Sequence, residues 1–204
     1  MIKKVSLLTL SLLTAISANA QPEWKLSDND TLGFDGYFRY GIGQSEHGDR
    51  QVAFGLPGAI AKYRLGNEPD YNAELALDYR HYLDGIDNNS RYIQLYYMRD
   101  GYLPHASSEK FEFDRVAQAY VKFANFLGEG VDVWFGRRYY DRKDIHINDH
   151  FWLNTGQNAG SGYGGGIEGI KINPGVLDVF VLRSSDEAAN DTKSTHIDFR
   201  LRDI

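Results

Sequence analysis

Residues 71–82 read YNAELALDYRHY, and this stretch decides the fold class. Its odd positions carry mainly apolar side chains, whereas Asn72, Glu74, Asp78 and Arg80 occupy even positions. Because successive side chains of a strand point to opposite faces, this period of two predicts a strand with one apolar and one polar face. Tyrosines frame the apolar row, which is typical of a strand that faces lipid between aromatic girdles while its charged row lines water.

The same period recurs toward both ends of the chain. In residues 34–42 aromatic side chains alternate with Asp35, Tyr37 and Arg39, and residues 197–202 repeat the pattern. Other stretches alternate less regularly but have the length and composition of strands. We expect nine strands in all, at residues 34–42, 61–65, 71–82, 92–98, 117–123, 131–135, 167–172, 176–182 and 197–201.

The connections between these strands are of two kinds. The segment 173–175, Asn-Pro-Gly, predicts a tight turn, because proline presets one turn angle and glycine tolerates a positive φ. Polar stretches at residues 44–58, 100–114 and 184–195 predict longer surface loops. Short turns on one side and long loops on the other suit a transmembrane antiparallel β-barrel, so we expect an all-β fold of this kind.

The N-terminus predicts export. Lys3 and Lys4 precede an apolar run over residues 5–16, and Ala18 and Ala20 supply the small residues of a cleavage site. This is the pattern of a secretory signal peptide. We expect residues 1–20 to be the signal peptide and residues 21–204 to form one structural unit.

Composition excludes several classes of protein. The formal net charge of −6 disfavours nucleic-acid binding, and the absence of cysteine excludes disulfides and thiolate metal sites. No run of about 20 apolar residues follows the leader, so a membrane could be crossed only by strands. Single-chain bacterial barrels close with an even number of strands. An odd count of nine therefore leads us to expect part of a longer barrel.

Several stretches resemble the maltoporin family. Residues 134–152, WFGRRYYDRKDIHINDHFW, resemble the inward-folded constriction loop of these porins. Residues 36–43, GYFRYGIG, resemble their first strand, and residues 62–68, KYRLGNE, resemble the segment that leads to the third. Further matches lie at residues 183–185 and 198–201, in the family's order and spacing.

This resemblance implies the N-terminal portion, about nine strands, of a porin barrel of about 18 strands. Such a porin is a homotrimer when full length, contacts outer-membrane lipid and lets maltodextrins or related oligosaccharides diffuse through it. The expected location is the bacterial outer membrane. The resemblance implies no chemical step, no cofactor and no nucleic-acid partner.

A sugar has apolar ring faces and a rim of hydroxyls, so its path needs aromatic platforms and charged hydrogen-bonding groups. The resemblance places platforms at Tyr37 and Phe151, and the parity of Tyr37 independently puts it on the face of Arg39. The polar track implied by the resemblance comprises Arg39, Arg64, Glu74, Arg115, Arg142, Asp144 and Asp149.

Three positions depart from the maltoporin pattern. Asn72 stands where the family has an aromatic residue, Phe151 where it has a tyrosine, and Asn154 where it has an aspartate. These changes remove a platform, a hydroxyl and a carboxylate from the expected path. They leave sucrose, β-glucosides or other oligosaccharides open as substrates.

The same residues allow two other interpretations. A soluble exported β-sandwich alternates in the same way, and Glu74, Asp144 and Asp149 could then form the carboxylate pair of a sugar-binding or glycoside-hydrolysing protein. His146 and His150 have a spacing that suits a metal on a helix, but their segment has the composition of a loop, so we expect no metal site.

Overall fold

The computed structural model describes residues 23–52, 69–87, 89–104, 111–113, 115–139, 161–184 and 195–204. These residues form one sheet of nine strands in the order of the chain, with every neighbouring pair antiparallel. The strands are β1 (Glu23–Lys25), β2 (Asp30–Tyr40), β3 (Asp70–Tyr82), β4 (Tyr92–Pro104), β5 (Arg115–Ala124), β6 (Asp132–Tyr139), β7 (Ser161–Lys171), β8 (Val176–Ser184) and β9 (Thr195–Arg202).

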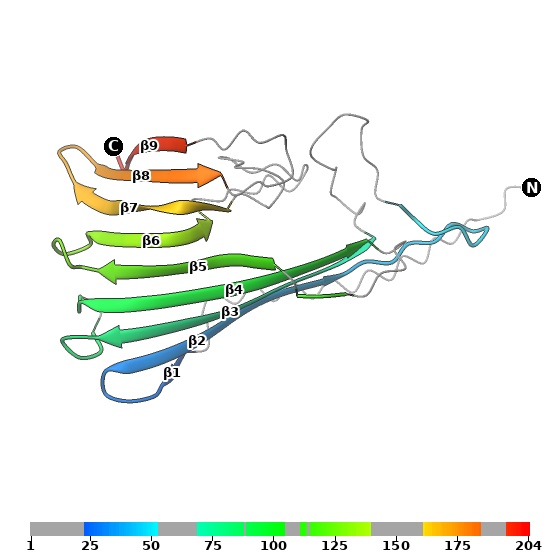
Figure 1. Ribbon diagram of the computed structural model, residues 1–204, viewed down its shortest axis with the longest axis horizontal. Helices are drawn as coiled ribbons and strands as arrows, with labels where there is room; N and C mark the ends of the chain where they lie inside the picture. Colours follow the sequence, from blue (N-terminus) through cyan, green and yellow to red (C-terminus); the bar gives the residue numbers. More distant parts are fainter. Residues whose placement is uncertain are drawn as a thin grey trace, which may run out of the picture.

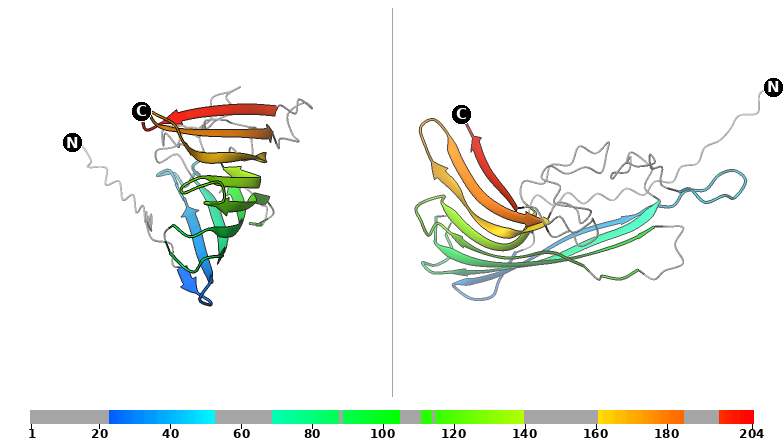
Figure 2. Two further views of the ribbon diagram at one scale, coloured as in Figure 1. Left: turned by 90° about the vertical axis from the view of Figure 1, so that its left-hand side faces the viewer. Right: turned by 45° about the horizontal axis from the view of Figure 1, so that its top comes forward.

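The sheet is curved into a trough, and its strands run side by side from β1 to β9 (Figures 1 and 2). Short connections join β1 to β2, β3 to β4, β5 to β6 and β7 to β8 at one end, on the left in Figure 1. The alternate connections, residues 41–69, 105–114, 140–160 and 185–194, are longer and join strands at the other end. The connections thus alternate between short turns and longer segments, as expected for a barrel with turns on one side and loops on the other.

Within the described ranges, no helix is long and apolar enough to cross a bilayer.

One face of the sheet, here called the apolar face, exposes large hydrophobic side chains on almost every strand. The register places Phe34 opposite Leu77 and Leu77 opposite Tyr97, so apolar residues meet across neighbouring strands. The exposed members of this face are Trp24, Phe34, Phe38, Tyr40, Leu75, Leu77, Leu95, Tyr97, Phe135, Tyr163, Val181, Ile197, Phe199 and Leu201. An exposed apolar surface of this extent is unfavourable in water and favourable in hydrocarbon.

The opposite face, here called the polar face, carries charged, amide and tyrosine side chains that are mostly buried or half-buried. Asp70, Asp78, Gln94 and Asp178 are all buried on it. Side chains converge on the inner side of a curved sheet and diverge on its outer side, so this crowded face is the concave one. The sheet therefore has the polarity of a barrel wall, with apolar side chains outside and polar ones inside.

Seven of the nine expected strands coincide with β3 to β9, and the first corresponds to β2. The expected strand at residues 61–65 and the expected constriction loop lie outside the described residues. The short β1 had no periodic signal, because it has only three residues.

β7 begins at Ser161, six residues before the expected strand at residues 167–172, so the glycine-rich segment belongs to the strand. The register places Gly166 between Trp134 of β6 and Phe180 of β8. A Cβ on Gly166 would lie 2.4 Å from Cβ of Phe180. Glycine fits here because the β8 chain at Val179 and Phe180 passes too close to leave room for a Cβ.

The described residues form a single sheet whose hydrophobic face is exposed. A sandwich would have to bury that face against a second sheet about 10 Å away. The sandwich geometry is therefore absent from the part of the chain that the structure describes.

Candidate functional site

Four polar residues form a row across β2, β3, β4 and β5, near the loop end of the polar face. The register places Tyr37 opposite Glu74, Glu74 opposite Asp100, and Asp100 opposite Arg115. Directly paired residues of neighbouring strands share a face, with strands about 4.8 Å apart. Three residues predicted for the sugar path, Tyr37, Glu74 and Arg115, are thus brought into one line.

A β-bulge brings Arg115 to this line. Gln118 pairs with Met98, yet Val116 pairs with Arg99, so β5 carries one extra residue between the two pairs. Strict alternation from Gln118 would have put Arg115 on the apolar face. The bulge reverses the alternation, as expected when two residues of one strand oppose one of the next.

Arg39 lies in the next row, opposite Asn72, which in turn pairs with Tyr102. Its Nε donates a hydrogen bond of 2.9 Å to Oδ1 of Asp70, and its Nη2 lies 2.8 Å from the same oxygen. Asp70 is only 1% exposed and Arg39 is 18% exposed. This charge-assisted contact fixes the guanidinium group on the polar face, and Arg39 itself lies one row from Tyr37 and Glu74.

The second arginine of the site is held in a similar way. Nη2 of Arg115 donates a hydrogen bond to Oδ2 of Asp100, and that carboxylate is buried. Tyr37, by contrast, remains 42% exposed, so its ring is accessible from the concave side. The cluster of Tyr37, Arg39, Glu74 and Arg115 therefore combines an accessible aromatic ring with fixed charged donors and acceptors.

The remaining residues of the predicted sugar path lie outside the described residues. They are Arg64, Arg142, Asp144, Asp149 and Phe151. His146 and His150 also lie outside, and the described part of the chain contains no group of three or more His, Asp or Glu side chains that could hold a metal.

Sequence reasoning missed the acidic partners of the two arginines. Asp100 falls within the expected loop at residues 100–114, but β4 continues to Pro104. Asp70 lies one residue before the expected strand at residues 71–82, although its even number gives it the parity of Asn72 and Glu74. Extending the period of two outward from each strand would have found both residues on the polar face.

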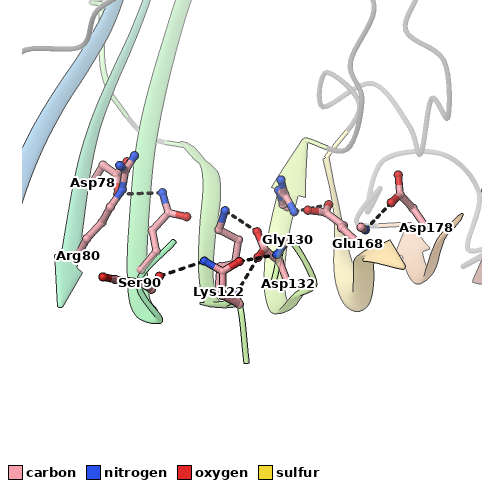
Figure 3. Close-up of polar contacts among 12 residues, drawn as sticks. Asp78, Arg80, Ser90, Lys122, Gly130, Asp132, Glu168 and Asp178 are labelled. Atoms are coloured by element: carbon pink, nitrogen blue, oxygen red, sulfur yellow. Dashed lines mark hydrogen bonds and ion pairs between the residues drawn. The ribbon is translucent and has the colours of Figure 1, made fainter. Parts of the chain in front are cut away.

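A second set of polar contacts crosses the polar face near the turn end (Figure 3). Asp78 contacts Arg80 at 2.7 Å and accepts a hydrogen bond of 2.8 Å from Gln94 on β4. Further ion pairs continue across the sheet to β9. They are Lys122 with Asp132 at 3.0 Å, Arg138 with Glu168 at 2.6 Å, and Arg202 with Asp178 at 2.8 Å.

Aromatic rings occupy the spaces between these charges. Tyr96 and Tyr120 stack with centroids 5.1 Å apart, and Arg138 lies 5.1 Å from the ring centroids of both Tyr120 and Trp134. These rings are buried or half-buried beneath the charged groups. The turn-end contacts therefore join neighbouring strands and stiffen the wall, whereas the cluster around Tyr37 has an accessible ring.

A curved sheet with an exposed apolar outer face and a charged inner face is the wall of a channel that crosses a membrane with strands. A family model described as LamB porin matches residues 32–204. The chain therefore belongs to the LamB porin family, which comprises sugar channels of the bacterial outer membrane and not enzymes. The predicted family and fold class are thus confirmed.

Cysteine labelling can test the orientation of the wall. Leu75 and Leu77 are 41% and 50% exposed on the apolar face. In vesicles, Leu75→Cys and Leu77→Cys should react with membrane-soluble maleimides and resist charged, water-soluble thiol reagents, because hydrocarbon excludes the latter. Tyr37→Cys, exposed on the polar face, is the matched control and should react with the charged reagent. Rapid labelling of either leucine variant by the charged reagent would contradict the assignment.

Proposed function

We propose that the protein mediates passive, saturable diffusion of maltodextrins or related oligosaccharides across the outer membrane. The observation that carries this proposal is the accessible ring of Tyr37 beside the ion-paired Arg39 and the row from Glu74 to Arg115. The ring would stack on the apolar face of a pyranose. The charged groups would exchange hydrogen bonds with its hydroxyls.

The ion pairs support this role because they preorganise the donors. Asp70 and Asp100 hold the two arginines in place, so a passing sugar need not pay to order those long side chains. A transport site must also release its ligand, and a sum of several weak contacts allows that. Arg64, Arg142, Asp144, Asp149 and Phe151 are proposed to complete the path.

Assembly and export follow from the same proposal. Residues 1–20 would act as a signal peptide, and residues 21–204 would form the N-terminal portion of the porin barrel. The apolar face would contact outer-membrane lipid, and the full-length protein would act as a homotrimer. No metal or organic cofactor is required for diffusion.

The test measures sugar block of ion current through the full-length protein in planar bilayers. Tyr37→Ala should weaken the block by maltotriose about five- to tenfold, since about 1–1.5 kcal/mol of stacking and apolar burial is lost. Titrating sucrose and cellobiose in parallel identifies the preferred sugar.

Tyr37→Phe is the matched control, because it keeps the ring and removes only the hydroxyl. It should retain most of the block. Equal block in the wild type and in Tyr37→Ala would refute the platform. If none of the three sugars blocked the ion current through the wild-type protein, the proposed function as a whole would be refuted.

A further inference from the structure

Tyr102 is a second accessible aromatic residue on the polar face, and it is not part of the sugar path proposed above. The register places Tyr102 of β4 opposite Asn72 of β3, and Asn72 opposite Arg39 of β2. Directly paired residues of neighbouring strands share a face. Tyr102 therefore lies on the polar face in the row of Arg39, and it is 39% exposed.

Exposure distinguishes Tyr102 from most aromatic residues of this face. Tyr82, Tyr96 and Trp134 are buried there. On the polar face of the described strands, Tyr37 is the other aromatic residue that is exposed to a similar extent. The buried rings join neighbouring strands, whereas Tyr37 and Tyr102 present aromatic surface to the inside of the trough.

The direction of its side chain excludes contact of Tyr102 with lipid. The next residue, Leu103, lies opposite Tyr71, whose odd position belongs to the apolar face. Because successive side chains of a strand alternate, Tyr102 points to the inner side of the wall. A ring on that side meets water or a solute and not hydrocarbon.

The residue opposite Tyr102 leaves room for a ligand on its ring. Asn72 stands where the maltoporin pattern has an aromatic residue. Directly opposed residues have Cβ atoms only about 5 Å apart, so an aromatic side chain at position 72 would pack against Tyr102. The smaller asparagine avoids this contact. An aromatic ring that is missing at position 72 is therefore present one strand away.

Tyr102 and Tyr37 are too far apart to stack on the same sugar ring. β3 lies between their strands, so their backbones are separated by two strand spacings, about 10 Å. Tyr102 also lies one row nearer the loop end, which adds about 7 Å along the strands. Two platforms at this separation suit two pyranose rings of one oligosaccharide.

Charged groups also lie beside Tyr102. Arg39, which is fixed by its ion pair, lies two strands away in the same row. The pair of Asp100 and Arg115 lies one row toward the turn end. A pyranose stacked on Tyr102 would thus have fixed hydrogen-bonding groups for its hydroxyls on two sides.

We propose that Tyr102 is a second stacking platform and that, together with Tyr37, it makes the path select oligosaccharides over monosaccharides. One pyranose ring of a bound sugar stacks on Tyr37, and another ring of the same molecule stacks on Tyr102. A monosaccharide occupies one platform at a time and gains from only one. This inference rests on the proposed function and adds to it a binding residue and a preference for chain length.

The test measures block of ion current by maltotriose and by glucose through the full-length protein in planar bilayers. Tyr102→Ala should weaken the block by maltotriose about five- to tenfold, because one of two stacking contacts is lost. Block by glucose should change less than about twofold, since Tyr37 still offers a platform. A general distortion of the wall would weaken both blocks alike, so the difference between the two sugars separates a binding role from a structural one.

Two variants are the controls. Tyr102→Phe keeps the ring and removes only the hydroxyl, so it should retain most of the block by maltotriose. Tyr97→Ala removes a similarly exposed tyrosine from the apolar face of the same strand. The current through this variant should be blocked by maltotriose as strongly as the wild-type current.

Three outcomes would overturn the second platform and leave the proposed transport intact. These are unchanged block by maltotriose in Tyr102→Ala, an equal loss of block for glucose and maltotriose, and an equal loss in Tyr97→Ala. If maltotriose did not block the wild-type current, the second platform would also be overturned. The proposed transport fails only if sucrose and cellobiose leave the wild-type current unchanged as well, so the two failures are distinguishable.

Discussion

Gly169→Ala is expected to destabilise the folded protein by more than about 3 kcal/mol, or to prevent folding altogether. Gly169 has a φ of +84°, a conformation that L side chains rarely adopt. A Cβ there would lie 1.8 Å from the carbonyl oxygen of Gly130. The backbone N–H of Gly169 also donates a hydrogen bond of 2.8 Å to Asp178, so the backbone cannot shift without losing that contact. Urea unfolding of vesicle-folded protein would measure the loss.

Gly85→Ala is the matched control for this prediction. Gly85 has the same φ of +84°, but a Cβ there would meet nothing within 4 Å. Its substitution should cost only about 1–2 kcal/mol, which is the backbone strain alone. If Gly169→Ala and Gly85→Ala lost similar amounts of stability, the close approach of Gly130 to Gly169 would not be the reason that glycine is required at position 169.

Asp70→Asn is expected to destabilise the protein by about 2–3 kcal/mol and to weaken sugar block of the current about fivefold or more. The substitution keeps the size of the side chain but removes the buried charge that holds Arg39. A guanidinium group that has lost its anionic partner is both less favourable and less well positioned for a sugar hydroxyl. Urea unfolding and planar-bilayer current measure the two effects separately.

Asp84→Asn is the comparison for an exposed pair. Arg91 donates two hydrogen bonds of 2.9 Å to the Asp84 carboxylate, which lowers the pKa of Asp84, but Asp84 is 46% exposed in a turn. Solvent screening should make the loss of stability there much smaller than in Asp70→Asn, with no change in sugar block. If Asp70→Asn and Asp84→Asn changed stability and sugar block equally, the burial of Asp70 would not explain the predicted effects of its substitution.

Strand identity and face could be predicted from sequence wherever the alternation is regular. Residues 71–82 gave the two faces of β3, and residues 34–40 placed Tyr37 with Arg39, because parity depends only on the chain itself. The alternation of apolar and polar residues is not regular in β7, because its glycine-rich segment has no hydrophobic row. Alternation also fails at Arg115. Counting from Gln118 would place Arg115 on the apolar face, whereas the bulge places it on the polar face.

The sequence by itself determined the class of fold, the apolar and polar faces of the regular strands, and the resemblance to sugar porins, since each depends on local order along the chain. Only the tertiary structure decided which residues stand opposite one another. The pairing of Tyr37 with Glu74 and the bulge that turns Arg115 inward both depend on strand register. Register is set by how separate strands fit together, and a shift of one residue would exchange the two faces of a strand.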